Sequence, residues 1–139
     1  RAHFQEQQPK TVLVTFGELK DIKSRADFVT GFLATGGIHS EWSPLFKGAQ
    51  GANEWLANEK PDYVVVCAKP SVTEEVLTDL LQGLPTRILI DAAGKFETEV
   101  SKKWLSNGLN GFIFNGQDKI AKLTEIKNKW KGVANNEKA

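Results

Sequence analysis

The chain has 139 residues, of which 40% are apolar and 25% are charged. This length and composition are those of one globular domain with its own core, which excludes a disordered, collagen-like or coiled-coil protein. The 18 basic and 17 acidic side chains leave a formal net charge of +1, so the chain lacks the strong positive charge that binding to nucleic acid or to an anionic membrane requires.

The cysteine and methionine content indicates which compartment and which kinds of site to expect. The single cysteine, Cys67, excludes an internal disulfide framework and a cysteine-rich zinc site. It fits the reducing cytoplasm, where we expect the protein to be. No apolar run approaches the ~20 residues that cross a bilayer, and no signal peptide opens the chain. Because the chain begins with Arg1 and contains no methionine, we expect it to be a piece of a longer protein.

The sequence predicts alternating strands and helices after a short polar lead-in. Residues 1–10 are rich in glutamine and predict a flexible lead-in or the end of a linker. Short apolar runs bounded by glycine, proline or charged residues predict strands at 11–16, 38–42, 63–67, 87–91 and 111–114. Apolar residues at helical spacing predict helices at 24–36, 49–58, 70–82, 97–106 and 118–131.

Single residues set some of these boundaries. Ser24 has the chemistry of an N-cap, with Asp27 three residues later, and is expected to open the first helix. Pro44 is expected to stop the second strand, because proline has no N–H to donate to a sheet. The residues expected on the inner face of the last helix are Ile120, Leu123, Ile126 and Trp130.

Five strand and helix pairs with short connections predict an α/β protein. The fold class that we expect is an open, doubly wound, five-stranded parallel sheet with a flavodoxin-like strand order. The run at 63–67 shows no alternation of apolar and polar residues, which is typical of a strand covered on both faces. We expect this domain to span residues 11–131 and residues 132–139 to fray.

Sheets of this kind bind ligands outside the carboxyl ends of their strands, near the switch between the first and third strands. Here the segments 17–23 and 68–71 would line that crevice. Neither has the glycine pattern of a dinucleotide site or P-loop, nor the serine, threonine and glycine content of a flavin loop. A phospho-receiver domain needs an aspartate at the end of the third strand, where this chain has Cys67 followed by Ala68 and Lys69. The sequence therefore argues against all four kinds of site.

Reactive side chains elsewhere form no recognisable site. Asp91 ends the fourth expected strand and is interpreted as a helix cap or a surface carboxylate. Cys67 is interpreted as a small buried apolar residue. His3 and His39, expected at the surface and half-buried respectively, lack the spacing of metal ligands. The tryptophans expected in the core or in helix packing are Trp42, Trp55, Trp104 and Trp130.

Two segments resemble a known family, the methylmalonyl-CoA mutases. Residues 24–38, SRADFVTGFLATGGI, are similar to the first helix and the entry to the second strand of their C-terminal domain. Residues 108–118, GLNGFIFNGQD, are similar to its fifth strand and the following turn. The likeness covers residues 10–131 and is greatest to the cobalamin-binding-like domain of the small (beta) subunit. It implies the same doubly wound sheet.

In the catalytic large subunit, this domain carries cobalamin on an Asp-x-His-x-x-Gly motif after the first strand. A Ser-x-Leu after the third strand and a Gly-Gly after the fourth help to hold the nucleotide tail. The matching crevice is degenerate in this chain, because no imidazole oriented by a carboxylate is present to ligate cobalt. We therefore expect no cofactor, no metal and no catalytic residue in this domain. The residues of the degenerate crevice are Gly17, Leu19, Asp21, Ile22, Ala68, Lys69, Ala93 and Gly94.

The resemblance implies a non-catalytic, cobalamin-binding-like domain of a mutase small subunit. Its partner would be the catalytic large subunit, which holds adenosylcobalamin, and the heterodimer would be an isomerase of methylmalonyl-CoA and succinyl-CoA. Neither nucleic acid nor a membrane is expected as a partner. Two alternatives stay open, a true corrinoid (cobalamin)-binding domain and a free-standing small-ligand binder on the same fold.

Overall fold

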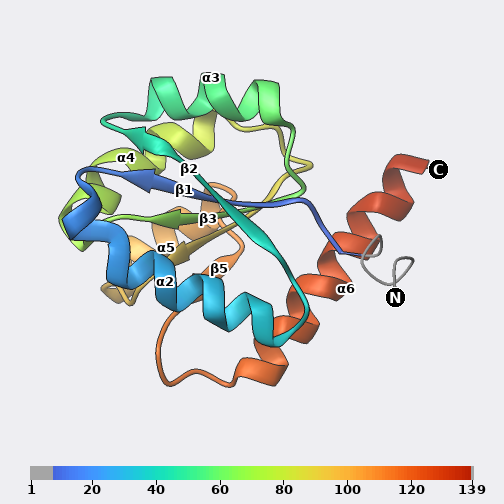
Figure 1. Ribbon diagram of the computed structural model, residues 1–139. Helices are drawn as coiled ribbons and strands as arrows, with labels where there is room; N and C mark the ends of the chain where they lie inside the picture. The colour runs from blue at the N-terminus through green and yellow to red at the C-terminus, as the bar shows by residue number, and fades with distance from the viewer. Residues whose placement is uncertain (1–7, 139) are drawn as a thin grey trace.

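The computed structural model describes the backbone of residues 8–138 and the side chains of residues 8–131, and the expectations for His3 and most of the lead-in lie outside this range. Within it, strands and helices alternate along the chain (Figure 1). The strands are β1 (Thr11–Phe16), β2 (Ser40–Phe46), β3 (Tyr63–Cys67), β4 (Leu89–Ala93) and β5 (Gly111–Ile113). The helices are α2 (Leu19–Thr35), α3 (Ala49–Glu59), α4 (Pro70–Gly83), α5 (Thr98–Ser106) and α6 (Lys119–Lys138).

The strands form one parallel sheet in the order β2-β1-β3-β4-β5. The predicted doubly wound, flavodoxin-like sheet is therefore confirmed. Every residue of the central strands β1 and β3 is buried, which explains why their sequences show no alternation.

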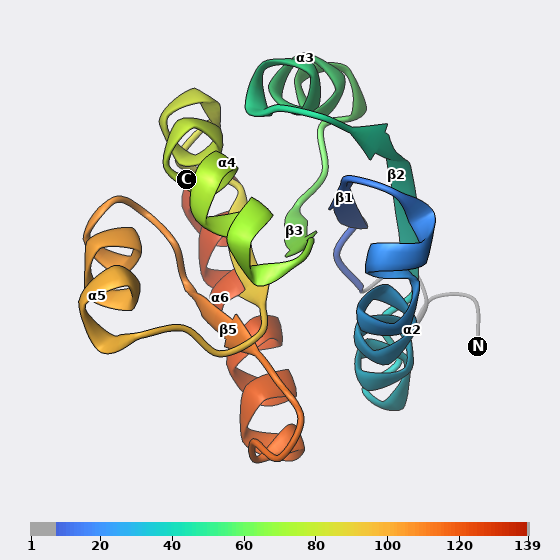
Figure 2. The same cartoon turned by 90° about the vertical axis from the view of Figure 1, so that its left-hand side faces the viewer.

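Helices cover both faces of the sheet, and Figure 2 shows α3, α4 and α5 on one side with α2 and α6 on the other. Successive residues of a strand point to opposite faces. Val64 and Val66 therefore join the core under α3, α4 and α5, which includes the buried indole of Trp104. Val65 and Cys67 join the second core under α2 and α6.

The first helix begins at Leu19 and not at Ser24, which is exposed within the helix and caps nothing. The reason is the apolar stripe of α2. Ile22 and Ala26 are fully buried, at the helical spacing that continues into Val29. Burying Ile22 requires the chain to be helical before it reaches Ser24, so packing against the sheet outweighs a local capping signal.

Strand β2 runs through Pro44 to Phe46, so the expected stop at this proline is wrong. β2 is an edge strand, where a residue without an N–H group on the outer side loses no hydrogen bond. The pairing of β1 with β2 shifts by one residue at Ser43 and Pro44, as in a β-bulge. At this irregularity the Ser43 hydroxyl accepts a hydrogen bond from the Thr15 N–H at 2.9 Å, so this backbone donor is satisfied.

The last helix extends to Lys138, beyond the Lys131 at which we expected it to end. Leu123 and Ile126 are buried as predicted, but Ile120 is 79% exposed. Lys122 lies on the inner face instead, one turn before Ile126, and is only 6% exposed. A buried lysine in place of an apolar residue needs a partner for its charge.

That partner is Asp91, a fully buried residue in the middle of β4 and not the cap or surface carboxylate that the sequence indicated. The Lys122 ammonium lies 3.1 Å from an Asp91 carboxylate oxygen. The Tyr63 hydroxyl donates to the same carboxylate at 2.5 Å, and the Asn110 side-chain amide donates to it at 2.8 Å. The buried carboxylate is thus neutralised by one cation and accepts two further hydrogen bonds.

A second carboxylate extends this network towards the surface. The Glu125 side chain accepts hydrogen bonds from Lys122 at 3.1 Å and from Asn110 at 3.0 Å. Burial acts to raise the pKa of Glu125, but the hydrogen bond from Asn110 and the charge of Lys122 outweigh it and lower the pKa. Burial, followed by the charge of Asp91, raises the pKa of Tyr63 well above its ordinary value.

Replacement of Lys122 by methionine tests the buried ion pair. We expect Lys122→Met to lower the free energy of unfolding by about 3–5 kcal/mol, because Asp91 is left charged and without its cation in the core. The double variant Asp91→Asn/Lys122→Met should recover part of this loss, since asparagine can still accept the hydrogen bond from Tyr63. Urea unfolding measures both effects. Lys127→Met on the exposed side of α6 is the control, and an equal loss in that variant would contradict the pairing.

Glu125 predicts a dependence of stability on acidity. Its folded-state pKa lies below the ordinary value of 4.5, so its contribution is fully present above that value and is lost as the pH falls through the lowered pKa. Glu125→Gln should therefore lower the melting temperature at neutral pH, and the gap to the parent chain should close on acidification. Melts across an acidic pH series check this. Glu75→Gln on exposed α4 is the matched control, and a gap that stays constant with pH would contradict the prediction.

Candidate functional site

The carboxyl ends of the parallel strands meet at one edge of the sheet, where the loops after β1, β3, β4 and β5 lie. The degenerate crevice was expected at this edge. Its eight residues do come from the ends of β1, β3 and β4 and from the start of α2, but they do not form one surface.

The crevice residues after β1 lie in different environments: one is in a turn, one is exposed and one is in the core. Gly17 has a φ of +103°, which favours glycine, and its N–H donates to the Phe46 carbonyl at 2.9 Å. Leu19 is 50% exposed, whereas Ile22 is fully buried under α2. Because Ile22 belongs to the core, it is not free to contact a ligand. Among the four, Asp21 lines the cavity described below.

Asp21 also meets Lys69, the first residue of the loop after β3 that carries a charge. Their side chains lie 3.7 Å apart, with 27% of the aspartate and 52% of the lysine side chain exposed. A solvated pair of this kind contributes little to stability. It does occupy the Asp21 carboxylate, which is the acidic group of the crevice that faces the cavity.

The end of β3 offers no nucleophile to solvent. The Cys67 side chain is fully buried, and burial raises the pKa of its thiol to about 12. Ala68, the next residue, is also fully buried. A thiol reacts as a thiolate, so Cys67 is held in its unreactive, neutral form. This agrees with its interpretation as a small apolar residue of the core.

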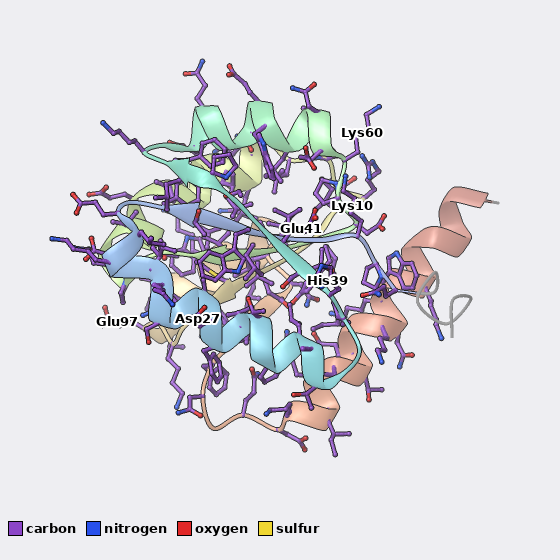
Figure 3. All side chains as sticks on the ribbon, in the orientation of Figure 1. Lys10, Asp27, His39, Glu41, Lys60 and Glu97 are labelled. Carbon is purple, nitrogen blue, oxygen red and sulfur yellow. The ribbon has the colours of Figure 1, made fainter. Side chains whose placement is uncertain are left out.

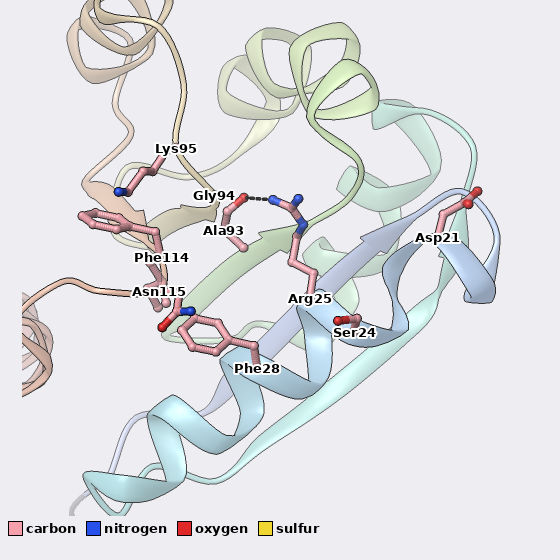
Figure 4. A pocket seen from close by; sticks show the side chains of 10 residues that line it. Asp21, Ser24, Arg25, Phe28, Ala93, Gly94, Lys95, Phe114 and Asn115 are labelled. Carbon is pink, nitrogen blue, oxygen red and sulfur yellow. Dashed lines mark hydrogen bonds between the residues drawn. The ribbon is translucent and has the colours of Figure 1, made fainter.

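A cavity of about 480 Å³ opens at this edge between α2 and the ends of β4 and β5 (Figure 4). Helix α2 contributes Asp21, Ser24, Arg25 and Phe28, the segment after β4 contributes Gly94 and Lys95, and the segment after β5 contributes Phe114 and Asn115. The cavity therefore combines two cationic side chains with two aromatic rings. We call it the α2 cavity.

Arg25 is fixed in this cavity by backbone geometry. Its Nη1 donates to the Ala93 carbonyl at 2.9 Å, as the dashed line in Figure 4 shows. The guanidinium passes directly beside Gly94, where a Cβ atom would lie 2.5 Å from Nη1. Gly94 also has a φ of +121°, a conformation that side chains rarely adopt. The turn therefore favours glycine at this position, and a side chain here would displace the Arg25 guanidinium.

The opposite wall of the cavity is held by the turn after β5. The Phe114 N–H donates to the Gln117 side-chain carbonyl at 2.9 Å, and the Gln117 amide donates back to the Phe112 carbonyl at 3.1 Å. These two bonds lock the turn. The Lys95 ammonium lies 4.9 Å from the centre of the Phe114 ring, a cation–π contact.

The sequence identified part of this cavity and missed the rest. Asp21, Ala93 and Gly94 were expected in a crevice and do line it. Arg25, Phe28 and Lys95 were not identified, because nothing in the local sequence marks them as neighbours. Arg25 and Phe28 are three residues apart on a helix and therefore share a face, which was the one available signal.

The described residues contain no group of three or more His, Cys, Asp or Glu that could hold a metal ion. His39 is exposed and not half-buried, and it immediately precedes β2 at the amino-terminal side of the sheet. Figure 3 shows it on the side opposite Glu97, which follows β4. The absence of a bound cofactor stays a prediction. In the part of the chain that the structure describes, no helix combines the length and apolar character needed to cross a bilayer.

No protein-family model matches this sequence, and the comparison with curated proteins returns no match. The fold is similar to several solved structures. NtrX from Brucella abortus in complex with ADP matches with a TM-score of 0.67 at 14% identity, over 94% of this chain and 28% of that chain. This chain thus spans little more than a quarter of NtrX.

Two shorter structures match over nearly their whole length. The signal receiver domain of a modulated diguanylate cyclase from Desulfovibrio desulfuricans G20 has a TM-score of 0.65 at 12% identity, over 93% of this chain and 98% of that chain. The CheY-like protein TadZ from Pseudomonas aeruginosa PAO1 has a TM-score of 0.62 at 13% identity, over 88% and 94%. At these identities the likeness shows the fold.

These structures overturn the expected membership of the mutase small subunit. They are signal receiver and CheY-like proteins and not cobalamin-binding domains. The expectations of an isomerase, of a heterodimer and of a mutase large subunit as the partner are therefore wrong. The two alternatives, a corrinoid-binding domain and a free-standing small-ligand binder, gain no support from these structures either.

Thiol labelling tests the placement of Cys67. We expect the native protein to react slowly with a disulfide reagent at mildly alkaline pH, because the thiol is buried and its pKa is raised to about 12. One equivalent should react at once in denaturant. The variant Ala121→Cys, on an exposed position of α6, provides a thiol that should label rapidly in the folded protein. Rapid labelling of native Cys67 would contradict the described end of β3.

Proposed function

We propose that this chain is a receiver-like signalling domain that acts by binding a partner protein and does not accept a phosphoryl group on its third strand. The strand order and the likeness to signal receiver and CheY-like structures support the first part. The residues at the carboxyl edge of the sheet support the second.

The observation that carries the proposal is the end of β3. Phosphoryl transfer to a strand end needs an exposed carboxylate as nucleophile. Here that place holds Cys67 and Ala68, both fully buried. A buried thiol with a pKa raised to about 12 cannot replace the carboxylate, because it is neither charged nor accessible.

The surroundings of β3 support the same proposal. Phosphoryl transfer from a small donor is assisted by a magnesium ion, which prefers clustered oxygen ligands. The described residues offer no cluster of three or more acidic or other metal-binding side chains. The nearby Asp21 is already paired with Lys69 at 3.7 Å. Among the described residues, this edge therefore offers neither an exposed carboxylate at the end of β3 nor a cluster of three acidic side chains.

A protein partner follows from the kind of domain to which the fold is similar. NtrX is much longer than this chain, and the receiver domain of the cyclase is named as part of a larger signalling protein. We propose that the partner is a kinase or an output domain of such a system, recognised through the surface of the folded domain.

Incubation with acetyl phosphate and Mg²⁺ tests the missing acceptor. We expect the intact mass to stay unchanged, because the end of β3 carries no accessible carboxylate. A phosphorylatable signal receiver domain, treated in parallel, should gain the mass of one phosphoryl group. An adduct on Asp21 or Glu18 that hydroxylamine removes would show that the domain is a phosphoryl acceptor after all.

Cross-linking in the producing cells tests the partner. Cross-linked peptides should join this domain to a protein that carries a kinase or output domain. Cross-links confined to metabolic enzymes would contradict the proposed signalling role. The two experiments are independent, since a domain can bind its partner whether or not it accepts a phosphoryl group.

A further inference from the structure

We propose that the α2 cavity binds a planar organic anion, namely an aromatic or heterocyclic ring that carries one carboxylate or phosphate group. This site goes beyond the proposed function and does not depend on whether the domain accepts a phosphoryl group. Its volume of about 480 Å³ lies within the ~300–1,000 Å³ range of small-molecule sites.

The first line of evidence is the unused hydrogen-bonding capacity of Arg25. A guanidinium has five N–H donors. Among the described residues, the Arg25 side chain uses one of them, in the hydrogen bond to the Ala93 carbonyl. No carboxylate among these residues lies within 4.0 Å of its side-chain nitrogens. Arg25 is half-buried, so a charge without a partner at this place carries a desolvation cost that a bound anion would remove.

The second line of evidence is that Arg25 is held in position before any ligand arrives. The hydrogen bond to the Ala93 carbonyl positions the guanidinium, and Gly94 leaves room for it. An arginine fixed in this way can donate two parallel hydrogen bonds to a carboxylate or phosphate at little further cost in side-chain entropy.

The net charge of the cavity points to an anion. Arg25 and Lys95 are both cationic, whereas Asp21, the acidic residue of the lining, is paired with Lys69 from outside the cavity. Figure 4 shows Arg25 on one side and Lys95 above Phe114 on the other. Lys95 makes no ion pair with a described carboxylate and is held instead against the ring face.

The aromatic walls define the remainder of the ligand. Phe28 and Phe114 are half-buried, and both line the cavity beside Ile113. Phe28 is supported from behind by Phe32, with ring centres 5.9 Å apart. The backbone of Phe114 is held by its hydrogen bond to Gln117 in the turn after β5. Rigid aromatic walls favour a flat ring over an aliphatic chain, and the exposed amide of Asn115 can hydrogen-bond to polar atoms on that ring.

Titration with defined probes tests the site. AMP supplies a heterocycle with a phosphate, and indole-3-carboxylate supplies a ring with a carboxylate. Adenosine supplies the ring without the anion, and inorganic phosphate supplies the anion without the ring. Proton–nitrogen NMR spectra follow the backbone amides of Gly94, Lys95 and Asn115. We expect saturable shifts at these amides with at least one of the two ring anions, and at least tenfold weaker binding of either half alone. The tighter of the two probes identifies phosphate or carboxylate as the preferred anion.

Variants connect the binding to the named residues. Arg25→Gln should raise the dissociation constant by about tenfold or more, because the charge-assisted hydrogen bonds to the anion are lost. Lys95→Gln, on an exposed side chain that the fold does not need, should weaken it less. Lys20→Gln, an exposed position of α2 outside the cavity, is the control and should leave binding unchanged. The spectra themselves report whether each variant is folded.

Three outcomes would overturn the proposal. The first is the absence of saturable shifts with both ring anions. The second is inorganic phosphate binding as tightly as AMP, which would mean an adventitious ion only. The third is unchanged affinity in folded Arg25→Gln. Because none of these readouts involves phosphoryl transfer or a partner protein, they are separate from the tests of the proposed function.

Discussion

The buried carboxylate of Asp91 is the constraint on which much of the architecture depends. A charge at the centre of β4 is tolerated only if it is paired and hydrogen-bonded, and Lys122, Tyr63 and Asn110 supply this from α6, β3 and the turn before β5. Helix α6 is therefore docked by an ion pair as well as by Leu123 and Ile126. Because α6 follows β5 directly, this docking also sets where the turn that carries Phe114 lies.

Packing on both faces leaves the edge of the sheet as the place where function can vary. Every residue of the central strands β1 and β3 is buried, so these strands offer no side chain to a ligand. At this edge the chain lacks an acceptor after β3 but gathers Arg25 and Lys95 around a cavity. This combination is the basis of our proposals that the domain binds a partner and a small anion.

The resemblance to mutases was misleading for a physical reason. The segment 24–38 contains the apolar stripe of α2 and the turn into β2, and the segment 108–118 contains β5 with its flanking turns. Any doubly wound sheet needs such a stripe and such turns, so similarity in these segments indicates a shared fold and not a shared function. The residues that would report the function are at the strand ends, and there the mutase motifs are absent. One fold supports many functions, and only the site distinguishes them.

The sequence by itself determined the order of elements, the parallel sheet and the boundaries of β3, because continuous apolar runs and helical spacing are local signals. The tertiary structure decided what local signals cannot. Packing of Ile22 began α2 before Ser24, and the edge position of β2 allowed Pro44 within a strand. Asp91 and Lys122, which form an ion pair, are far apart in the chain, and so are Arg25 and Lys95, which line one cavity. Each pair of residues meets only when folding brings β4, α2 and α6 together, so no pattern of neighbouring residues could reveal either arrangement.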